Sequence, residues 1–274
     1  MVMRNYNFMD IKTYTDKTGT LYGKLFSAYD EKLFEASVDL FAARHKRWGI
    51  DVSWFKDKVC LDGGCGGGRY LVALSRLGAR EVQGIDLSTE HVSLVKKRLA
   101  DRALTQAHVR QASVLDIPFA DNYFDFVVST GVIHHTPNPR QAFSELGRVL
   151  KPGGRMFLAV YGKGGLAWAM VDTVRATLAK IIPFTVAERL ARLAGVPANK
   201  RYNIMDNFYV PYCFRFRERE IRSWFAEEKF ENVRRLPVDY YDYTRLSTRI
   251  IHGEGWIQMY AVKKVLYDKT TFQS

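Results

Sequence analysis

The chain opens with a helical pattern and then changes to alternating short strands and helices. Between residues 21 and 47, apolar side chains recur at intervals of three and four, which predicts a helix. Short apolar runs follow that fit buried strands, at 58–61, 82–85, 108–111, 124–128 and 156–160. The segments between them predict helices at 70–77, 88–99 and 137–150. This alternation indicates βαβ units, and therefore a parallel sheet with helices on both faces.

The alternation stops after Tyr161 for about fifty residues. It resumes with a predicted helix at 218–228 and strands at 233–236 and 257–262. We therefore expect an N-terminal helical extension over 1–56 and one α/β domain over 57–274. A substrate-covering insert is predicted at about 162–216.

The first helical stretch of this insert is amphipathic and too charged to cross a membrane. Asp172, Arg175 and Lys180 interrupt it. Its apolar stripe is predicted to pack as a lid and consists of Leu166, Met170, Val174, Leu178 and Ile181.

Composition fits a large globular domain and gives little support for nucleic acid as a partner. The chain has 274 residues, of which 47% are hydrophobic, so a substantial core can be buried. The net charge of +12 is spread evenly along the chain, whereas a nucleic-acid footprint is normally clustered. An anionic substrate, or peripheral contact with an anionic membrane surface, stays open.

Cysteine usage and the N-terminus indicate a reducing compartment. The three cysteines form an odd set without the spacing of a disulfide framework or a metal site. The first residues are polar and lack a signal-peptide core. We therefore expect a cytoplasmic protein.

A glycine cluster directly after the first predicted strand carries the clearest chemical signal. Residues 59–70 read Val-Cys-Leu-Asp-Gly-Gly-Cys-Gly-Gly-Gly-Arg-Tyr, a strand, a tight turn and a helix start. Such a turn brings the backbone close to a nucleotide-like ligand. The dinucleotide fingerprint fails, because Arg69 or Leu71 falls where the third small residue belongs. Asp62 before the glycines would repel a pyrophosphate but suits a ligand with a positive ammonium group, as in S-adenosylmethionine.

A second acid, Asp86, ends the next predicted strand. A carboxylate at this place can accept hydrogen bonds from both hydroxyls of a ribose. Taken alone, Asp86 would also fit a helix cap or a solvated loop acid. Together with Asp62 and the glycines, it predicts ribose binding.

Residues 57–161 resemble the class I S-adenosylmethionine-dependent methyltransferases, in particular the small-molecule and quinone-biosynthesis branch, methyltransferase type 11. The matching stretches are 62–68, 84–87, 117–119, 124–126, 133–135 and 148–154. The resemblance implies a Rossmann-like, doubly wound, mostly parallel seven-stranded sheet with an antiparallel last strand. It also implies S-adenosylmethionine as cofactor, bound by Asp62, Gly63, Gly64, Gly66, Gly68, Asp86, Leu87, Ser113, Val114 and Thr130.

The sequence departs from the family at the adenine contact. The family usually has an acid a few residues before the Leu-Pro-Phe-like stretch, which bonds the adenine amino group. Alignment on residues 117–119 places Ser113 there, followed by Val114. A hydroxyl can still accept this bond, although less strongly than a carboxylate.

Two adjacent histidines, His134 and His135, follow the fourth predicted strand, at the rim where ligands bind in such sheets. Either could act as a general base. The resemblance instead favours a role in shaping the cofactor pocket, because histidines occur here in family members with different substrates. No third ligand accompanies them, so no metal site is expected.

The C-terminal half concentrates aromatic residues between 202 and 260. Tyr209 and Arg215 lie in a stretch where aromatics alternate with arginines, and we assign them to the acceptor site. Residues 162–216 and 239–254 are predicted to line that site. We expect methyl transfer to a small-molecule acceptor of aromatic, apolar or anionic character. A membrane-associated quinone or lipid methylase, an RNA methyltransferase and a non-catalytic S-adenosylmethionine-binding partner remain alternatives.

Overall fold

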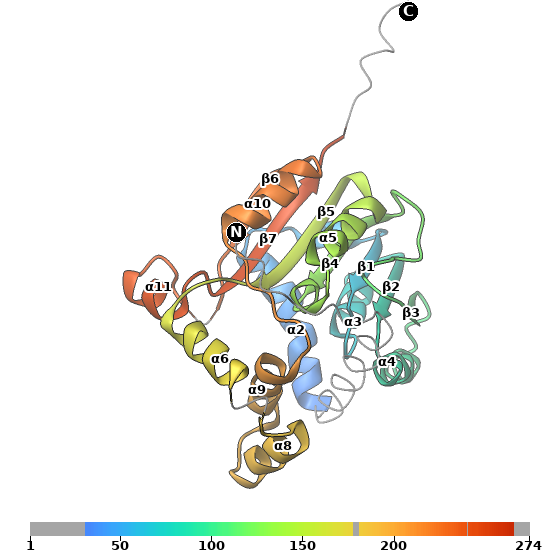
Figure 1. The fold of residues 1–274 in the computed structure, drawn as a ribbon. Helices are drawn as coiled ribbons and strands as arrows, with labels where there is room; N and C mark the ends of the chain where they lie inside the picture. The colour runs from blue at the N-terminus through green and yellow to red at the C-terminus, as the bar shows by residue number, and fades with distance from the viewer. Residues whose placement is uncertain (1–30, 178–180, 240, 266–274) are drawn as a thin grey trace, which may run out of the picture.

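The computed structural model describes residues 31–177, 181–239 and 241–265. Its centre is a seven-stranded sheet in the order β3-β2-β1-β4-β5-β7-β6 (Figure 1). The strands are β1 (Val59–Gly63), β2 (Glu81–Asp86), β3 (Ala107–Gln111), β4 (Phe124–Thr130), β5 (Leu150–Tyr161), β6 (Phe230–Leu236) and β7 (Trp256–Lys263). The helices are α2 (Glu31–Arg47), α3 (Arg69–Arg76), α4 (Thr89–Asp101), α5 (Pro139–Val149), α6 (Leu166–Ala176), α8 (Phe184–Leu193), α9 (Ala198–Tyr209), α10 (Glu218–Glu227) and α11 (Leu246–His252).

The strand directions confirm the predicted doubly wound architecture. Strands β1 to β5 pair in parallel, and β7 runs antiparallel between β5 and β6. The predicted end of α5 needs correction, because that helix ends at Val149 and β5 begins at once at Leu150. Pro152, Gly153 and Gly154 do not separate the two elements. They lie within β5, where its pairing with β4 shifts register.

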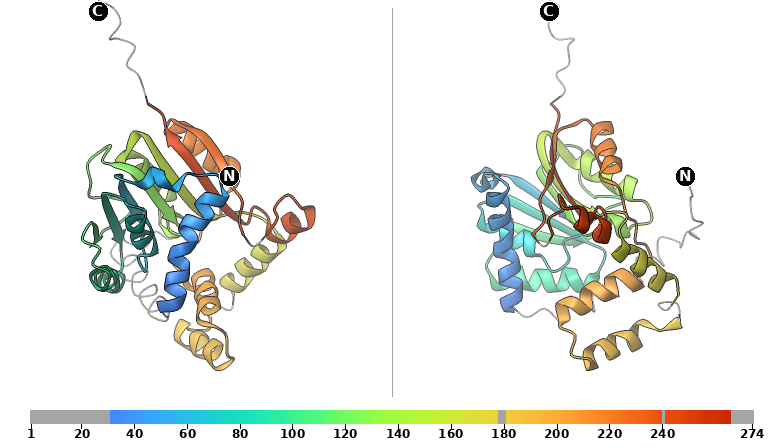
Figure 2. Two further views of the ribbon diagram at one scale, coloured as in Figure 1. Left: turned by 180° about the vertical axis from the view of Figure 1, so that it is seen from behind. Right: turned by 90° about the vertical axis from the view of Figure 1, so that its left-hand side faces the viewer.

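Helices cover both faces of the sheet and bury one apolar cluster on each (Figures 1 and 2). The cluster shared with α2, α3 and α4 includes Phe41, Phe55 and Phe126. The opposite cluster, shared with α5 and α10, includes Phe143 and Phe225. All three cysteines, Cys60, Cys65 and Cys213, are buried, and none forms a disulfide.

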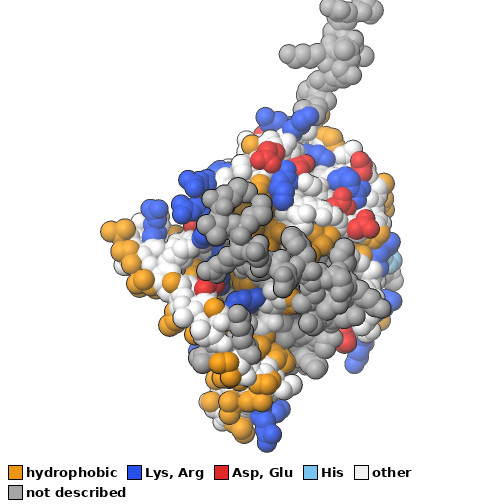
Figure 3. Space-filling model, in the orientation of Figure 1, with side chains coloured by type: hydrophobic (Ala, Val, Ile, Leu, Met, Phe, Trp, Pro, Cys, Tyr) orange, Lys and Arg blue, Asp and Glu red, His pale blue; other side chains and the backbone are white. Residues whose placement is uncertain are grey.

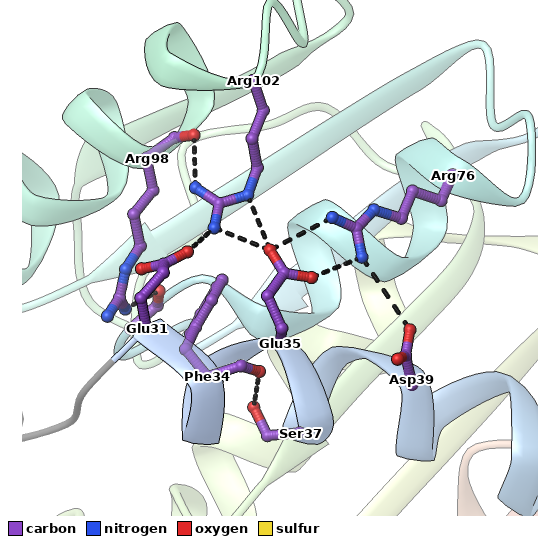
Figure 4. A network of polar contacts seen from close by, with 9 residues as sticks. Glu31, Phe34, Glu35, Ser37, Asp39, Arg76, Arg98 and Arg102 are labelled. Atoms are coloured by element: carbon purple, nitrogen blue, oxygen red, sulfur yellow. Dashed lines mark hydrogen bonds and ion pairs between the residues drawn. The ribbon is translucent and has the colours of Figure 1, made fainter.

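Helix α2 confirms residues 31–47 of the predicted N-terminal helix, while residues 21–30 lie outside the described part of the chain. It crosses the back of the molecule in Figure 2 and packs against α3. Glu35 joins it to both neighbouring helices, through Arg76 at 2.7 Å and Arg102 at 2.7 Å (Figure 4). Phe34 lies 3.8 Å under the guanidinium of Arg98. The helix is therefore part of the core cluster that includes Phe41, Phe55 and Phe126.

The insert contains α6, α8 and α9, which extend away from the sheet (Figure 1). The predicted inward packing of its first apolar stripe is wrong for Leu166, Met170 and Ile181, which are 67%, 66% and 77% exposed. Val174 is half-buried, and Leu178 lies outside the described residues. Helices α6 and α8 contain no buried residue, so the insert offers an apolar outer surface. No helix among the described residues is long and apolar enough to span a membrane.

Candidate functional site

The glycine loop forms the tight turn that the sequence predicts. The backbone N–H groups of Gly64 and Cys65 both donate to the Ile85 carbonyl at 2.9 Å, which ties the turn to the end of β2. Gly68 has φ +84°, a left-handed conformation that favours glycine, and immediately precedes α3. Gly64 also has a positive φ, and a Cβ there would collide with Val132. The loop thus depends on glycine for conformation and for space.

Asp86 completes this turn from the neighbouring strand. Its carboxylate accepts from the backbone N–H of Gly66 at 2.8 Å and of Ser88 at 2.9 Å, and contacts His91 Nδ1 at 3.1 Å. Ser88 caps α4, so the predicted helix start is confirmed within one residue. Asp86 therefore fixes the relative position of the β1 and β2 loops in addition to its expected role at a ribose.

Asp62 lies at the end of β1 and is only 1% exposed. Its Oδ2 atom is buried and has no hydrogen-bond partner among the described residues. Burial raises the pKa of this carboxyl to about 8, with the Arg69 guanidinium opposing the rise and the Asp86 carboxylate adding to it. A buried acceptor without a partner is costly. A ligand that brings a cationic donor to Asp62 would remove that cost.

The predicted residue Thr130 contacts two side chains, Tyr70 and Arg69, that the sequence did not assign to the site. Thr130 at the end of β4 donates to the Tyr70 hydroxyl at 3.2 Å, and Arg69 donates to the same hydroxyl at 3.2 Å. Arg69 and Tyr70 open α3, directly after the glycines. Their position within the glycine motif was visible in the sequence. The contact with Thr130 was not, because it joins residues sixty positions apart.

The remaining predicted cofactor residues occupy loops at the same carboxyl edge of the sheet. Leu87 follows β2 and is half-buried, and Val114 is buried and packs near Gly63. Ser113 follows β3, and its Oγ accepts from the Leu115 N–H at 3.1 Å. That bond orders the loop and leaves the hydroxyl able to accept a second donor.

The two histidines form the 3-10 helix η2 (Ile133–His135), directly after β4. His134 is completely buried, and neither ring nitrogen has a partner among the described residues. Burial and the positive influence of His135 and Arg215 lower the pKa of His134 well below 6.5. His135 Nδ1 lies 2.8 Å from the Tyr212 carbonyl. Since a carbonyl only accepts, Nδ1 carries the proton and the lone pair of the neutral ring lies on Nε2.

The chain returns to this edge through residues 212–216. The Phe214 N–H donates to the His134 carbonyl at 2.8 Å, and the Phe216 N–H to the Tyr161 carbonyl at 3.0 Å. Arg215 is therefore held between two backbone bonds, close to the histidines. Its side chain is 8% exposed, pairs with Asp172 and lies 4.3 Å from the Trp168 ring centroid.

Aromatic rings surround the histidines. The Tyr161 ring lies 4.2 Å from His134, 5.3 Å from Trp168 and 5.1 Å from Trp256, centroid to centroid. Trp256 also approaches Gly131, the residue after β4. We call Tyr161, Trp168, Trp256 and His134 the aromatic cluster. It brings together β5, β7, α6 and η2 beside the glycine loop.

Tyr209 is not joined to this cluster by its contacts. Its hydroxyl donates to the Ile182 carbonyl at 3.0 Å, and its ring packs on Phe184 at 5.6 Å. Both contacts lie within the insert. Among the described residues, no group of three or more His, Cys, Asp or Glu side chains is placed to hold a metal ion.

Comparison with known proteins agrees with this geometry. Residues 61–158 match the methyltransferase domain family. This match places a methyltransferase domain within residues 61–158. The domain is 30% identical over 151 residues to a demethylmenaquinone methyltransferase of Halalkalibacterium halodurans, covering 53% of this chain and 60% of that protein. It is 37% identical over 101 residues to phosphoethanolamine N-methyltransferase 2 of Caenorhabditis elegans, covering 37% of this chain and 23% of that protein. The chain thus spans less than two thirds of either relative.

A solved structure shows the same fold. Magnesium protoporphyrin IX methyltransferase from Synechocystis PCC 6803, with bound S-adenosylhomocysteine, has a TM-score of 0.54 at 16% identity. The alignment covers 93% of this chain and 98% of that one. The methyltransferase domain supports S-adenosylmethionine as the cofactor. The unpartnered carboxylate oxygen of Asp62 fits the ammonium group of that cofactor.

Proposed function

We propose that the protein is an S-adenosylmethionine-dependent methyltransferase that acts on a small molecule. The observation that carries the proposal is the juxtaposition of the Asp62 and Asp86 loops with the aromatic cluster at one edge of the sheet. Ligands of doubly wound sheets bind at this edge. When bound, S-adenosylmethionine supplies a methyl group already activated by its sulfonium.

The cofactor would be held from four loops. Asp62 would face the ammonium group and Asp86 the ribose hydroxyls, while the glycine loop leaves room for the backbone to approach. Leu87 and Val114 would pack against the adenine, and Ser113 would accept from its amino group. Thr130, which contacts Tyr70 and Arg69, would form the wall of the cofactor site at the end of β4.

The acceptor would lie beside the histidines, under the insert. The chain's task there is to align the acceptor and exclude water, and positioning can supply roughly 7–11 kcal/mol of a barrier. Where the acceptor must lose a proton, the Nε2 lone pair of His135 could take it. The lowered pKa of His134 keeps that ring neutral, which suits an apolar wall more than a base.

Two measurements test the proposal together. Calorimetry should show one S-adenosylhomocysteine bound per chain. Incubation with radiolabelled S-adenosylmethionine should label one fraction of a metabolite extract, and ribonuclease treatment should leave that label intact. Binding without label transfer to any fraction would favour a non-catalytic cofactor-binding protein, and a ribonuclease-sensitive label would favour an RNA methyltransferase.

A second candidate, a methylase of membrane-embedded quinones or lipids, is favoured by the outer surface of the insert. Exposed apolar side chains gather on α6, α8 and α11, at the lower and left ends of the molecule in Figure 3. Exposed arginines accompany them and comprise Arg189, Arg192, Arg245 and Arg249. An apolar face with basic residues suits an anionic lipid surface.

A further inference from the structure

One edge of the Arg215 guanidinium is buried without a hydrogen-bond partner among the described residues, and we call it the bare edge. Nη1 pairs with Asp172, whereas Nε and Nη2 are buried and have no hydrogen-bond partner among the described residues. The Nε–H and one Nη2–H point in the same direction and form a two-pronged donor. Two parallel donors of this kind match the two oxygens of a carboxylate.

The protein builds this edge in place. The residues on either side of Arg215 are fixed by backbone bonds to the ends of η2 and β5. Trp168 supports the guanidinium face at 4.3 Å, and Asp172 holds the opposite edge while remaining 47% exposed to water. Burying two charge-assisted donors without acceptors is costly. A ligand that supplies the acceptors would offset that cost.

The surroundings of the bare edge are aromatic. Trp168, which carries the guanidinium, packs on Tyr161, and Tyr161 packs on His134. Trp256 packs on Tyr161 at 5.1 Å and contacts the residue after β4. Flat rings at stacking distances suit a planar aromatic body. His134 adds two buried nitrogens without a described partner on the same side of the fold.

We propose that the methyl acceptor is an aromatic carboxylate, with its carboxylate bound by Nε and Nη2 of Arg215 and its ring against the aromatic cluster. This inference rests on the proposed function and defines the substrate class of the same site. Arg215 is then a binding residue, which orients the acceptor toward the C-terminal end of β4. The net charge of +12, which is spread evenly along the chain, is consistent with an anionic substrate.

The test compares matched ligand pairs on the full chain saturated with S-adenosylhomocysteine. The pairs are benzoate with benzamide, 4-hydroxybenzoate with 4-hydroxybenzamide, and 3,4-dihydroxybenzoate with its amide. Calorimetry should show at least one carboxylate binding about tenfold or more tightly than its amide. Arg215→Lys, which keeps the charge but loses the two-pronged donor, should clearly reduce that preference and leave S-adenosylhomocysteine affinity unchanged. Arg189→Lys, on the exposed face of α8, should retain it.

The outcomes separate this inference from the proposed function. Failure to bind S-adenosylhomocysteine would refute the proposed function before any carboxylate is added. Normal cofactor binding without a carboxylate preference in any pair, or with a preference that Arg215→Lys leaves undiminished, would overturn only the inference. Should Arg215→Lys fold poorly, Arg215→Gln provides a second test, because it removes the guanidinium charge and should abolish the preference. An unchanged preference in that variant would contradict the inference.

Discussion

Burial raises the pKa of the Asp62 carboxyl to about 8, so this group is mostly protonated near pH 7. To face a cationic ammonium it must lose that proton. Binding of S-adenosylhomocysteine should therefore release close to one proton, and affinity should rise as pH increases from about 6 to 8, by up to about tenfold per pH unit. Calorimetry in buffers of different ionisation enthalpy measures the released proton. Asp62→Asn should bind S-adenosylhomocysteine more weakly and without this pH dependence. If the affinity of the wild-type protein does not change with pH, Asp62 does not contact the ammonium group.

Asp86 offers a test of the ribose contact. Asp86→Ala removes the acceptor for two hydroxyls and should cost on the order of 1.5–3 kcal/mol of cofactor binding. The same variant also loses the bonds to Gly66 and Ser88, so Asp86→Asn is the matched control. Asn keeps one of the two acceptor oxygens, so the loss of affinity in this variant should be intermediate. Unchanged affinity in both variants would mean that the ribose lies elsewhere.

Single-turnover methyl transfer at saturating cofactor should distinguish the roles of the two histidines. His135→Ala should lower the rate, typically by 10²–10⁴-fold if His135 is the base. His135→Asn restores a donor toward the Tyr212 carbonyl without supplying a base. If the Asn variant recovers most of the rate, His135 only positions the 212–216 segment. His134→Ala should lower the rate less, because the lowered pKa of His134 makes its ring a poor base.

Helix α2 ties the stability of the fold to pH through His45. Burial lowers the pKa of this residue to about 4, and its Nδ1 atom bonds the Phe41 carbonyl. The unfolded chain takes up the proton near pH 6.5, before the folded protein does. The stabilisation is therefore complete above about pH 6.5 and is lost as pH falls to about 4, at a total of roughly 3 kcal/mol. Urea unfolding at pH 7.5 and pH 5 measures this loss, which His45→Phe should reduce; an equal pH dependence in that variant would assign it to other groups.

The elements at the cofactor edge could be predicted because their signals are local. A strand, its acid and the glycines that follow are contiguous in sequence, and the periodicity of each helix lies within one segment. The aromatic cluster could not be predicted in this way. Tyr161 faces Trp256 only because β5 and β7 pair antiparallel in one register, across almost a hundred positions. Likewise, the alternation at Arg215 marked an unusual stretch, but its attachment to η2 and β5 is a tertiary contact.

Periodicity also identified the apolar stripe of the insert without showing what the stripe faces. Three and four residue spacing predicts that one side of a helix is apolar. In an insert outside the main core, that side can turn inward to a substrate or outward to a partner. Leu166, Met170 and Ile181 are exposed, so these side chains are not packed into the core of the described chain. The molecule thus combines a buried α/β core with an insert that exposes several apolar side chains.

If this outer surface contacts lipid, the whole protein should sediment with vesicles that contain anionic phosphatidylglycerol and less with pure phosphatidylcholine vesicles. Basic residues near a membrane contribute about 1 kcal/mol each on anionic lipid, and apolar side chains add to this in proportion to the area they bury. Replacing Leu190 and Leu193 of α8 by Glu should release the protein, because these side chains are 56% and 74% exposed. The same double variant should bind S-adenosylhomocysteine normally, since α8 contributes no buried residue to the core. Leu40→Glu, at a 43% exposed position on α2, tests whether any added acid would have the same effect. Equal sedimentation of all three proteins would show that α8 does not make the lipid contact. No sedimentation of the wild type would reject the membrane-embedded acceptor and leave a dissolved small molecule.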